Sequence, residues 1–225
     1  MKPIGHIHTK ISGKFGIPRQ SGVIPELSGV IVFEPEYRTP DAFRGLEEFS
    51  HIWLIWQFSE AVSDDDTFSA TVRPPRLGGN TRMGVFATRS PFRPNNIGIS
   101  AVRLTKIDFN ANDGPVLFVS GIDLMDGTPI YDVKPYLRYA DSIPEASDGF
   151  TETLSDLSLS LEFPEQLLCK IPENHRKELQ EILKHDPRPG YQKDPERIYG
   201  LTFAGFNIKF RVSNHVLTVF EVDLH

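Results

Sequence analysis

The chain has 225 residues, 39% of them hydrophobic, with one cysteine and a formal net charge of −6. This composition excludes an intrachain disulfide, a cysteine-rich zinc site and a membrane span of roughly 18 apolar residues, and the negative charge argues against nonspecific coating of nucleic acid. Because the N-terminus lacks the apolar run of a signal peptide, we expect a cytoplasmic protein with one large β domain or a main and a small domain.

Proline and glycine cut the first two thirds of the chain into short apolar runs, which favours strands and turns over long helices. Thr39 and Pro40 have the residue types of a helix cap and first turn, so they predict a short helix over 39–46. His6 and His8 alternate on one face of an early strand, but no third ligand lies near them and we expect no metal site. The other apolar runs predict strands at residues 29–33, 51–58, 83–88, 97–107, 116–123 and 130–133.

Nearly every residue from His51 to Phe58 is apolar. We expect both faces of this strand to be covered, one by the interior of a barrel and the other by a partner layer such as a second subunit. His51, Trp53 and Trp56 are then expected to be core or interface residues.

The stretch from Thr67 to Ile107, called the acid-free stretch below, contains seven basic residues and no Asp or Glu. The chain has 24 basic and 30 acidic residues, so the remainder has 17 basic against 30 acidic residues and a charge near −13. This segregation predicts a surface for an anionic ligand. The seven cations are Arg73, Arg76, Arg82, Arg89, Arg93, Arg103 and Lys106.

Within the acid-free stretch, the run from Gly84 to Gly98 changes from a strand-like segment to a loop rich in Arg, Pro and Asn. Arg89 and Arg93, with the side-chain amides of Asn95 and Asn96, predict a polar hollow for a carboxylate, a phosphate or a ribose. The alternative is a structural turn in which the arginines bond main-chain carbonyls.

A second candidate turn, Asp126–Ile130, follows the strand predicted at 116–123. It combines a carboxylate, a glycine able to adopt positive φ and a turn fixed by proline. Asp-Gly turns are also common connectors, so this motif alone does not establish a site. Lys134 is expected to neutralise nearby carboxylates and not to act as a base.

The composition changes at residues 143–156, which are rich in Asp, Ser, Glu, Pro and Gly and predict a linker. Residues 157–225 then predict a small α+β domain, with a strand at 157–163, helical spacing over 164–185 interrupted by Pro172, and a final hairpin over 206–222. The run Asp186–Tyr191 follows the last helix. Its prolines stop the helix, and its carboxylate and aromatic ring are also suited to holding an extruded adenine.

The sequence lacks the motifs of several common enzyme classes. No Gly-x-Gly-x-x-Gly run follows a strand and no Gly-Lys-Ser/Thr phosphate loop is present, which argues against Rossmann methyltransferases and dehydrogenases. No serine elbow or Cys/His pair supports acyl transfer.

Six motif blocks occur in order and at compact spacing within about residues 4–142. They are Pro18–Gly22, Gly45–Trp53, Thr71–Asn80, Gly84–Gly98, Asp126–Ile130 and Asp132–Tyr136. Together they resemble the TrmO family, also called the YaeB family. Asp186–Tyr191 with the final hairpin is similar to the longer bacterial members that carry a C-terminal domain.

This resemblance implies a mainly β protein with an N-terminal barrel at 1–142, a linker at 143–156 and a small domain at 157–225. It implies a homodimeric tRNA methyltransferase that uses S-adenosylmethionine, with a methyl group placed on N6 of threonylcarbamoyl-adenosine at position 37. Carried over by motif, the cofactor contacts fall on Pro18, Arg19, Gln20, Ser59, Glu60, Arg89, Ile99, Asp126, Gly127, Thr128 and Pro129.

We expect arginines to bind the carboxylate of the substrate or the phosphates of the tRNA. We expect Asp186 or Tyr191 to position the base, as the catalytic residues. Two other classes of function stay open at this point. One is a module that binds S-adenosylmethionine or a nucleotide without chemistry, and the other is a hydrolase of a small anionic metabolite that uses His51 or Asp126. The expected tRNA contacts are Arg73, Arg76, Arg82, Arg93 and Arg188.

Overall fold

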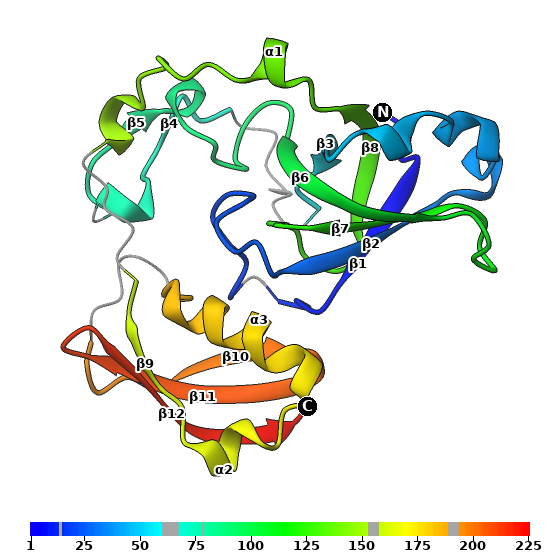
Figure 1. Cartoon of the computed structure of the whole chain (residues 1–225). Helices are drawn as coiled ribbons and strands as arrows, with labels where there is room; N and C mark the ends of the chain where they lie inside the picture. The colour runs from blue at the N-terminus through cyan, green and yellow to red at the C-terminus, as the bar shows by residue number, and fades with distance from the viewer. Residues whose placement is uncertain (14, 60–67, 78, 153–157, 189–193) are drawn as a thin grey trace.

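The structure is a computed structural model of the chain. It describes every residue except 14, 60–67, 78, 153–157 and 189–193, and it describes Arg76 by its backbone alone. Two bodies of sheet are joined by a long connection (Figure 1). No described helix is both long and apolar enough to cross a membrane.

The first body is a closed antiparallel barrel, as the sequence predicts, with strand order β1-β2-β7-β6-β3-β8. Alternate residues point inward, so Ile7, Ile31, Leu54, Val102 and Ile130 are all buried at 1% exposure or less. The strands are β1 (Gly5–Thr9), β2 (Ser28–Phe33), β3 (His51–Gln57), β6 (Ile97–Asp108), β7 (Val116–Ser120) and β8 (Thr128–Pro135).

The outer face of β3 is less covered than its apolar sequence predicts. Trp56 is buried, whereas Trp53 and Ile55 on the other face are only half-buried. Trp53 packs against Tyr136, with 5.5 Å between ring centroids, and its indole N–H donates to Asp141 at 3.0 Å in the short helix α1 (Arg138–Asp141). Apolar surface is therefore left on this side of the barrel within the one chain.

Two local predictions are wrong. The strand expected at 83–88 ends at Gly84, in the two-stranded sheet of β4 (Thr71–Val72) and β5 (Met83–Gly84), because the Thr88 amide and hydroxyl both bond the Val85 carbonyl and close a 3-10 turn. The helix expected at 39–46 is a 3-10 turn over Pro40–Phe43, and the Thr39 side chain makes no capping hydrogen bond. Other 3-10 turns span Pro35–Tyr37, Leu46–Glu48, Pro75–Leu77 and Gly149–Thr151.

The second body is the C-terminal module, a four-stranded sheet of order β10-β11-β12-β9 covered by helices. Pro172 precedes the second helix and separates it from the first, as predicted. The sequence did not predict β10, the strand that precedes the final hairpin. The elements are β9 (Ser160–Glu162), α2 (Glu165–Leu168), α3 (Glu173–Lys184), β10 (Tyr199–Phe203), β11 (Phe206–Ser213) and β12 (Val216–Leu224).

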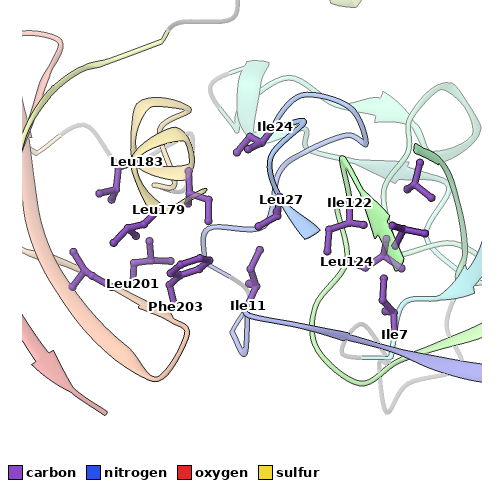
Figure 2. Close-up of a cluster of buried hydrophobic side chains, with 14 of the residues drawn as sticks. Ile7, Ile11, Ile24, Leu27, Ile122, Leu124, Leu179, Leu183, Leu201 and Phe203 are labelled. Carbon is purple, nitrogen blue, oxygen red and sulfur yellow. The ribbon is translucent and has the colours of Figure 1, made fainter. Parts of the chain in front are cut away.

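The C-terminal module is docked on the segment between β1 and β2. Figure 2 shows side chains from this segment, such as Ile11, meeting Leu179 and Phe203 of the module in a continuous buried cluster. At its edge the buried Glu178 accepts hydrogen bonds from Lys10 at 2.6 Å and from Ser28 at 2.7 Å. Apolar packing and paired polar groups therefore fix the module against the barrel.

Candidate functional site

A set of hydrogen bonds draws three distant segments together at one end of the barrel. Arg89, from the loop before β6, donates a hydrogen bond to the Gln20 side chain. The Asp123 carboxylate, just after β7, accepts a hydrogen bond from the Ser21 amide and interacts electrostatically with Arg89. We call Gln20, Ser21, Arg89, Ser100 and Asp123 the carboxylate cluster; the sequence placed Gln20 and Arg89 at a cofactor, and the structure brings them together.

The orientation of the Ser100 hydroxyl is fixed by its neighbours. The Trp56 indole N–H can only donate, and it lies 3.0 Å from Ser100 Oγ. Ser100 therefore accepts from Trp56 and donates its own proton to Asp123 Oδ1 at 2.6 Å. Ser100 is 1% exposed and Trp56 is 7% exposed, so this chain of bonds is held inside the barrel.

Burial raises the pKa of the Asp123 carboxyl to about 6. Hydrogen bonds from Ser100 and from the backbone amides of Asp123 and Ser21, together with the Arg89 charge, act in the other direction and do not cancel the effect of burial. Asp123 therefore changes charge near neutral pH. Sequence reasoning missed this residue, although a lone carboxylate between the apolar Ile122 and Leu124 was a readable signal.

Two close approaches explain why glycine occurs beside this cluster. A Cβ on Gly98 would lie 2.3 Å from Cε2 of Trp56, so only glycine leaves room for the indole that holds Ser100. Gly121 has φ +74°, and the Gly22 amide donates to its carbonyl at 2.8 Å. The loop that carries Gln20 is thereby tied to the end of β7.

The predicted Asp126–Pro129 turn leads into β8, whose first residues are Thr128 and Pro129, and it is hydrogen-bonded to β1. Asp126 Oδ1 accepts from the Thr9 amide at 2.9 Å and lies 3.4 Å from His8 Nδ1. Gly127 has φ +74°, as the turn requires, and the buried Thr128 donates its hydroxyl to the Met125 carbonyl at 2.7 Å. Asp126 remains nearly half exposed, so its second oxygen is available to a ligand.

One short segment connects this turn with the carboxylate cluster. Asp123 and Asp126 are three residues apart, so their Cα atoms are separated by at most about 11 Å. The combined surface offers a guanidinium for a carboxylate and carboxylates for an ammonium or ribose hydroxyls. These residue types suit a small zwitterionic nucleoside such as S-adenosylmethionine.

The remaining predicted cofactor residues lie in different surroundings. Pro18 is buried and Arg19 is exposed beside Gln20. Ile99 is 53% exposed on the outer face of β6, opposite to the inward face that carries Ser100. Ser59 is exposed after β3, and Glu60 lies outside the described residues.

The arginines of the acid-free stretch divide into two kinds. Arg93 donates to the Thr88 carbonyl at 3.0 Å and to the Ser90 carbonyl at 3.5 Å, which is the structural-turn alternative for this one residue. Arg73 and Arg82 are exposed near the small β4–β5 sheet. The backbone of Arg76 lies in the 3-10 turn Pro75–Leu77.

In the C-terminal module, Asp186 and Arg188 form a bidentate ion pair. Arg188 Nε lies 2.7 Å from Oδ1 of Asp186 and Nη2 lies 2.9 Å from Oδ2. The Arg188 guanidinium also covers the ring of Tyr199, with 5.8 Å to its centroid, and the hydrogen bond that Arg188 donates to Asp186 raises the Arg188 pKa. A base bound by Asp186 must share these oxygens with Arg188; Tyr191 lies outside the described residues.

The histidines and Lys134 have other partners. His6 lies 3.2 Å from Glu34, and His51 is exposed, with its Nδ1 2.9 Å from the Ser50 hydroxyl, so His51 is not a core residue of the single chain. Lys134 pairs with Asp132 at 2.8 Å, which confirms the prediction that it neutralises a carboxylate. The described part of the chain contains no group of three or more His, Cys, Asp or Glu residues arranged for a metal ion.

Comparison with known proteins matches both bodies of the molecule. Residues 6–142 match the family profile described as the tRNA-methyltransferase O N-terminal domain, and residues 157–225 match the TrmO C-terminal domain. The chain is 38% identical over 228 residues to the tRNA (adenine(37)-N6)-methyltransferase of Escherichia coli K12, with 98% of this chain and 96% of that protein covered.

Two further similarities extend this result. A Pseudomonas aeruginosa protein named as an S-adenosylmethionine-dependent methyltransferase is 40% identical over 209 residues, covering 89% of this chain and 87% of that protein. A crystal structure of TrmO from P. aeruginosa superposes with a TM-score of 0.78 at 32% identity, covering 99% of this chain and 95% of that one.

Proposed function

The chain belongs to the TrmO family of tRNA methyltransferases, and from this premise we propose that it methylates N6 of threonylcarbamoyl-adenosine at position 37 of tRNA. S-adenosylmethionine is the methyl donor of the family. The observation that carries the proposal to specific residues is the carboxylate cluster, where Gln20, Arg89 and Asp123 meet beside the Asp126 turn. This surface is the proposed cofactor site.

In this site Arg89 binds the carboxylate of the cofactor, and the Asp126 turn binds its ammonium or ribose. When bound, the cofactor supplies a methyl group on a sulfonium. Asp123 accepts hydrogen bonds from the Ser100 hydroxyl and from the Ser21 amide. These bonds keep the loop that carries Gln20 in position when a ligand leaves. Positioning of this kind supplies most of the rate gain in a methyl transfer, because the reacting atoms must be in line.

The threonylcarbamoyl group of the proposed substrate affects both the reactivity of N6 and the binding of the tRNA. The threonylcarbamoyl group makes N6 part of a urea-like system, which renders its proton more acidic than that of a plain adenine amine, and it carries a carboxylate. An exposed arginine of the acid-free stretch, Arg73 or Arg82, is the proposed partner of this carboxylate or of an anticodon phosphate. Asp186, oriented by Arg188, is the proposed contact to the base from the C-terminal module, together with Tyr191.

We further infer a homodimer. The outer face of the barrel exposes Ile99 by 53%, and nearby α1 and the segment after it expose Tyr139 by 88% and Ile143 by 61%. Covering apolar groups of this size is a common function of a subunit interface. Sedimentation equilibrium tests this, with a twofold mass expected and a monomer at micromolar concentration opposing it.

The division into a barrel at 1–142, a linker at 143–156 and a module at 157–225 also remains a proposal. We propose a cytoplasmic location as well, because the proposed substrate is a tRNA. Limited proteolysis with mass analysis tests the division, and cleavage concentrated within 143–156 supports it.

The function is tested with two tRNA preparations that differ only in the threonylcarbamoyl group. The protein is incubated with isotopically labelled S-adenosylmethionine and either tRNA, and the labelled nucleoside is identified by mass spectrometry. We expect label only in the modified tRNA, on the position 37 adenosine. Label in both preparations would overturn the proposed substrate, and cofactor binding by calorimetry without any labelled nucleoside would indicate a binding module.

A further inference from the structure

Part of the acid-free stretch exposes aromatic rings to solvent. Phe68 is 56% exposed, Phe86 is 73% exposed and Phe92 is 59% exposed. Six phenylalanines in the described part of the chain are large exposed apolar groups, and these three fall within 25 residues of sequence. Phe68 and Phe86 are nearly parallel, with 26° between ring planes and 6.3 Å between centroids.

The exposure of these rings follows from the local backbone. In the small sheet, Thr71 pairs with Gly84, and the Val85 amide continues the pairing by donating to the Ala70 carbonyl at 3.0 Å. This pairing brings the chain at Phe68 beside the chain at Phe86. Figure 1 shows β4 and β5 together, away from the body of the barrel.

Val85 determines which way Phe86 points. Val85 is 1% exposed and acts as the anchor of the 3-10 turn, which Thr88 closes through two bonds to the Val85 carbonyl. Because successive residues of the turn point in different directions, burial of Val85 leaves Phe86 on the outside. The ring is therefore held in solvent by an ordered turn.

Two exposed cations belong to the same small sheet as the rings. Arg73 and Arg82 lie on the segments that continue from β4 and precede β5, and the acid-free stretch itself contains no carboxylate, although Asp64–Asp66 precede it in the sequence. The rest of the chain is strongly acidic, with 17 basic against 30 acidic residues. Exposed aromatic faces with arginines on the same small sheet are the combination that binds unpaired nucleotides, through stacking and phosphate contacts.

We propose that Phe68 and Phe86 form a stacking surface for unpaired bases of the anticodon loop, with Arg73 and Arg82 on the adjoining phosphates. This inference rests on the proposed function for the identity of the RNA. A second copy of the chain is the less favoured occupant, because a symmetric dimer brings the same patch of both copies together and would oppose positive charge to positive charge. Stacking holds the loop while the modified base enters the cofactor site.

The experiment measures binding of a fluorescein-labelled, unmodified anticodon stem-loop RNA to the full chain at several salt concentrations. We expect Phe86→Ala to weaken binding about tenfold, within the range of one lost base stack, and Phe86→Trp to restore it. The slope of log affinity against log salt should stay as in the parent, because no cation is removed. Arg82→Ala should instead reduce that slope by about one.

Phe109→Ala is the matched control. Phe109 is 42% exposed just beyond the far end of β6, whose 12 residues place it on the order of 35 Å from the loop that precedes the strand. Parent-like binding is expected for this variant. If Phe86→Ala binds like Phe109→Ala, or if it weakens self-association and leaves RNA affinity unchanged, the stacking surface is refuted.

Failure of this inference can be told from failure of the proposed function. Suppose that the parent methylates modified tRNA and that Phe86→Ala is equally active at subsaturating tRNA. The stacking surface is then rejected and the proposed function is retained. If the parent methylates no tRNA but its stem-loop binding still depends on Phe86, the proposed function is rejected and the RNA-stacking surface is retained.

Discussion

The end of the barrel takes Arg89 and Ser100 from the acid-free stretch, and the small β4–β5 sheet lies wholly within it, yet the two regions expose their polar and apolar groups in opposite ways. At the barrel end, Ser100 and Trp56 are buried and each hydrogen bond has a fixed direction. At the small sheet, the aromatic rings and arginines face solvent. A ligand of constant shape is suited to the first kind of surface, and a variable RNA loop is suited to the second.

The difference also concerns how charge is used. Arg89 is bonded to Gln20 and lies near Asp123, so it acts at one point within an arranged site. Arg73 and Arg82 act through a field that reaches several ångströms into solvent and is screened by salt. Variants of the two regions should therefore change different quantities.

Arg89→Ala should have the largest effect on activity. Loss of a charge-assisted contact to the cofactor carboxylate, with disruption of the Gln20 contact, should lower kcat/KM for S-adenosylmethionine by about 100-fold. Arg103→Ala is the matched control, because Arg103 is exposed on the same stretch but lies on the outer face of β6, opposite His51. Equal losses in the two variants would show that only general positive charge matters.

Asp123→Asn should change how stability depends on pH. The folded-state pKa of about 6 lies above the ordinary value of about 4, so folding favours the protonated form, and the Asp123 contribution is lost as pH rises through this window. Above pH 6 the parent bears the cost of the buried charge, about 3 kcal/mol, which the asparagine variant lacks.

Urea unfolding of both proteins between pH 4 and 7 tests this. The stability of the parent relative to Asp123→Asn should fall with rising pH and become constant above pH 6. A difference that is flat over the whole range, or that rises with pH, would contradict the assigned titration.

Ser100→Ala should produce a smaller loss. It leaves the Trp56 indole N–H and Asp123 Oδ1 without their shared partner, and we expect KM for S-adenosylmethionine to rise about tenfold with little change in RNA affinity. Thr105→Ala on the same strand is the control, because its hydroxyl is exposed and donates to the Phe118 carbonyl, away from the carboxylate cluster. Unchanged cofactor kinetics in Ser100→Ala would mean that the buried chain does not position the loop.

Arg82→Ala should produce the smallest effect. Removal of one exposed cation should weaken stem-loop binding a few-fold at low salt and leave KM for the cofactor unchanged. Arg211→Ala, an exposed arginine on β11 of the C-terminal module, is the comparison. A larger cofactor effect than RNA effect in Arg82→Ala would place this residue with the barrel end.

Much of the fold could be predicted because local sequence specifies it. The apolar runs identified five of the six barrel strands within a few residues, and Pro172 marked the boundary between two helices. The strand expected at 83–88 could not be corrected from sequence, because its end depends on burial of Val85 by the tertiary structure. The same is true of the open face of β3, since apolar sequence does not say what covers it.

In the candidate site, too, some residues could be predicted from the sequence and others depend on tertiary contacts. Arg89 and Asp126 could be named because their residue types and loops carry recognisable chemistry, and Gln20 was named through the family resemblance. Ser100 could not be named, because its importance comes from the contact of β3, β6 and the end of β7 in space. Asp123 was visible in the sequence only as a lone carboxylate between apolar residues, and its partners come from the same contact. The ion pair of Asp186 with Arg188 was likewise invisible until the turn at Asp186, with φ +50°, placed the two side chains together.

One kinetic measurement tests the division of the acid-free stretch most directly: KM for S-adenosylmethionine and KM for modified tRNA in the parent, Arg89→Ala and the double variant Phe86→Ala/Arg82→Ala. We expect Arg89→Ala to raise the cofactor KM with little change in the tRNA KM, and the double variant to do the reverse. If both variants raise the same constant to a similar extent, the stretch forms one binding surface and not two, and the separation of a cofactor end from an RNA-stacking sheet is contradicted.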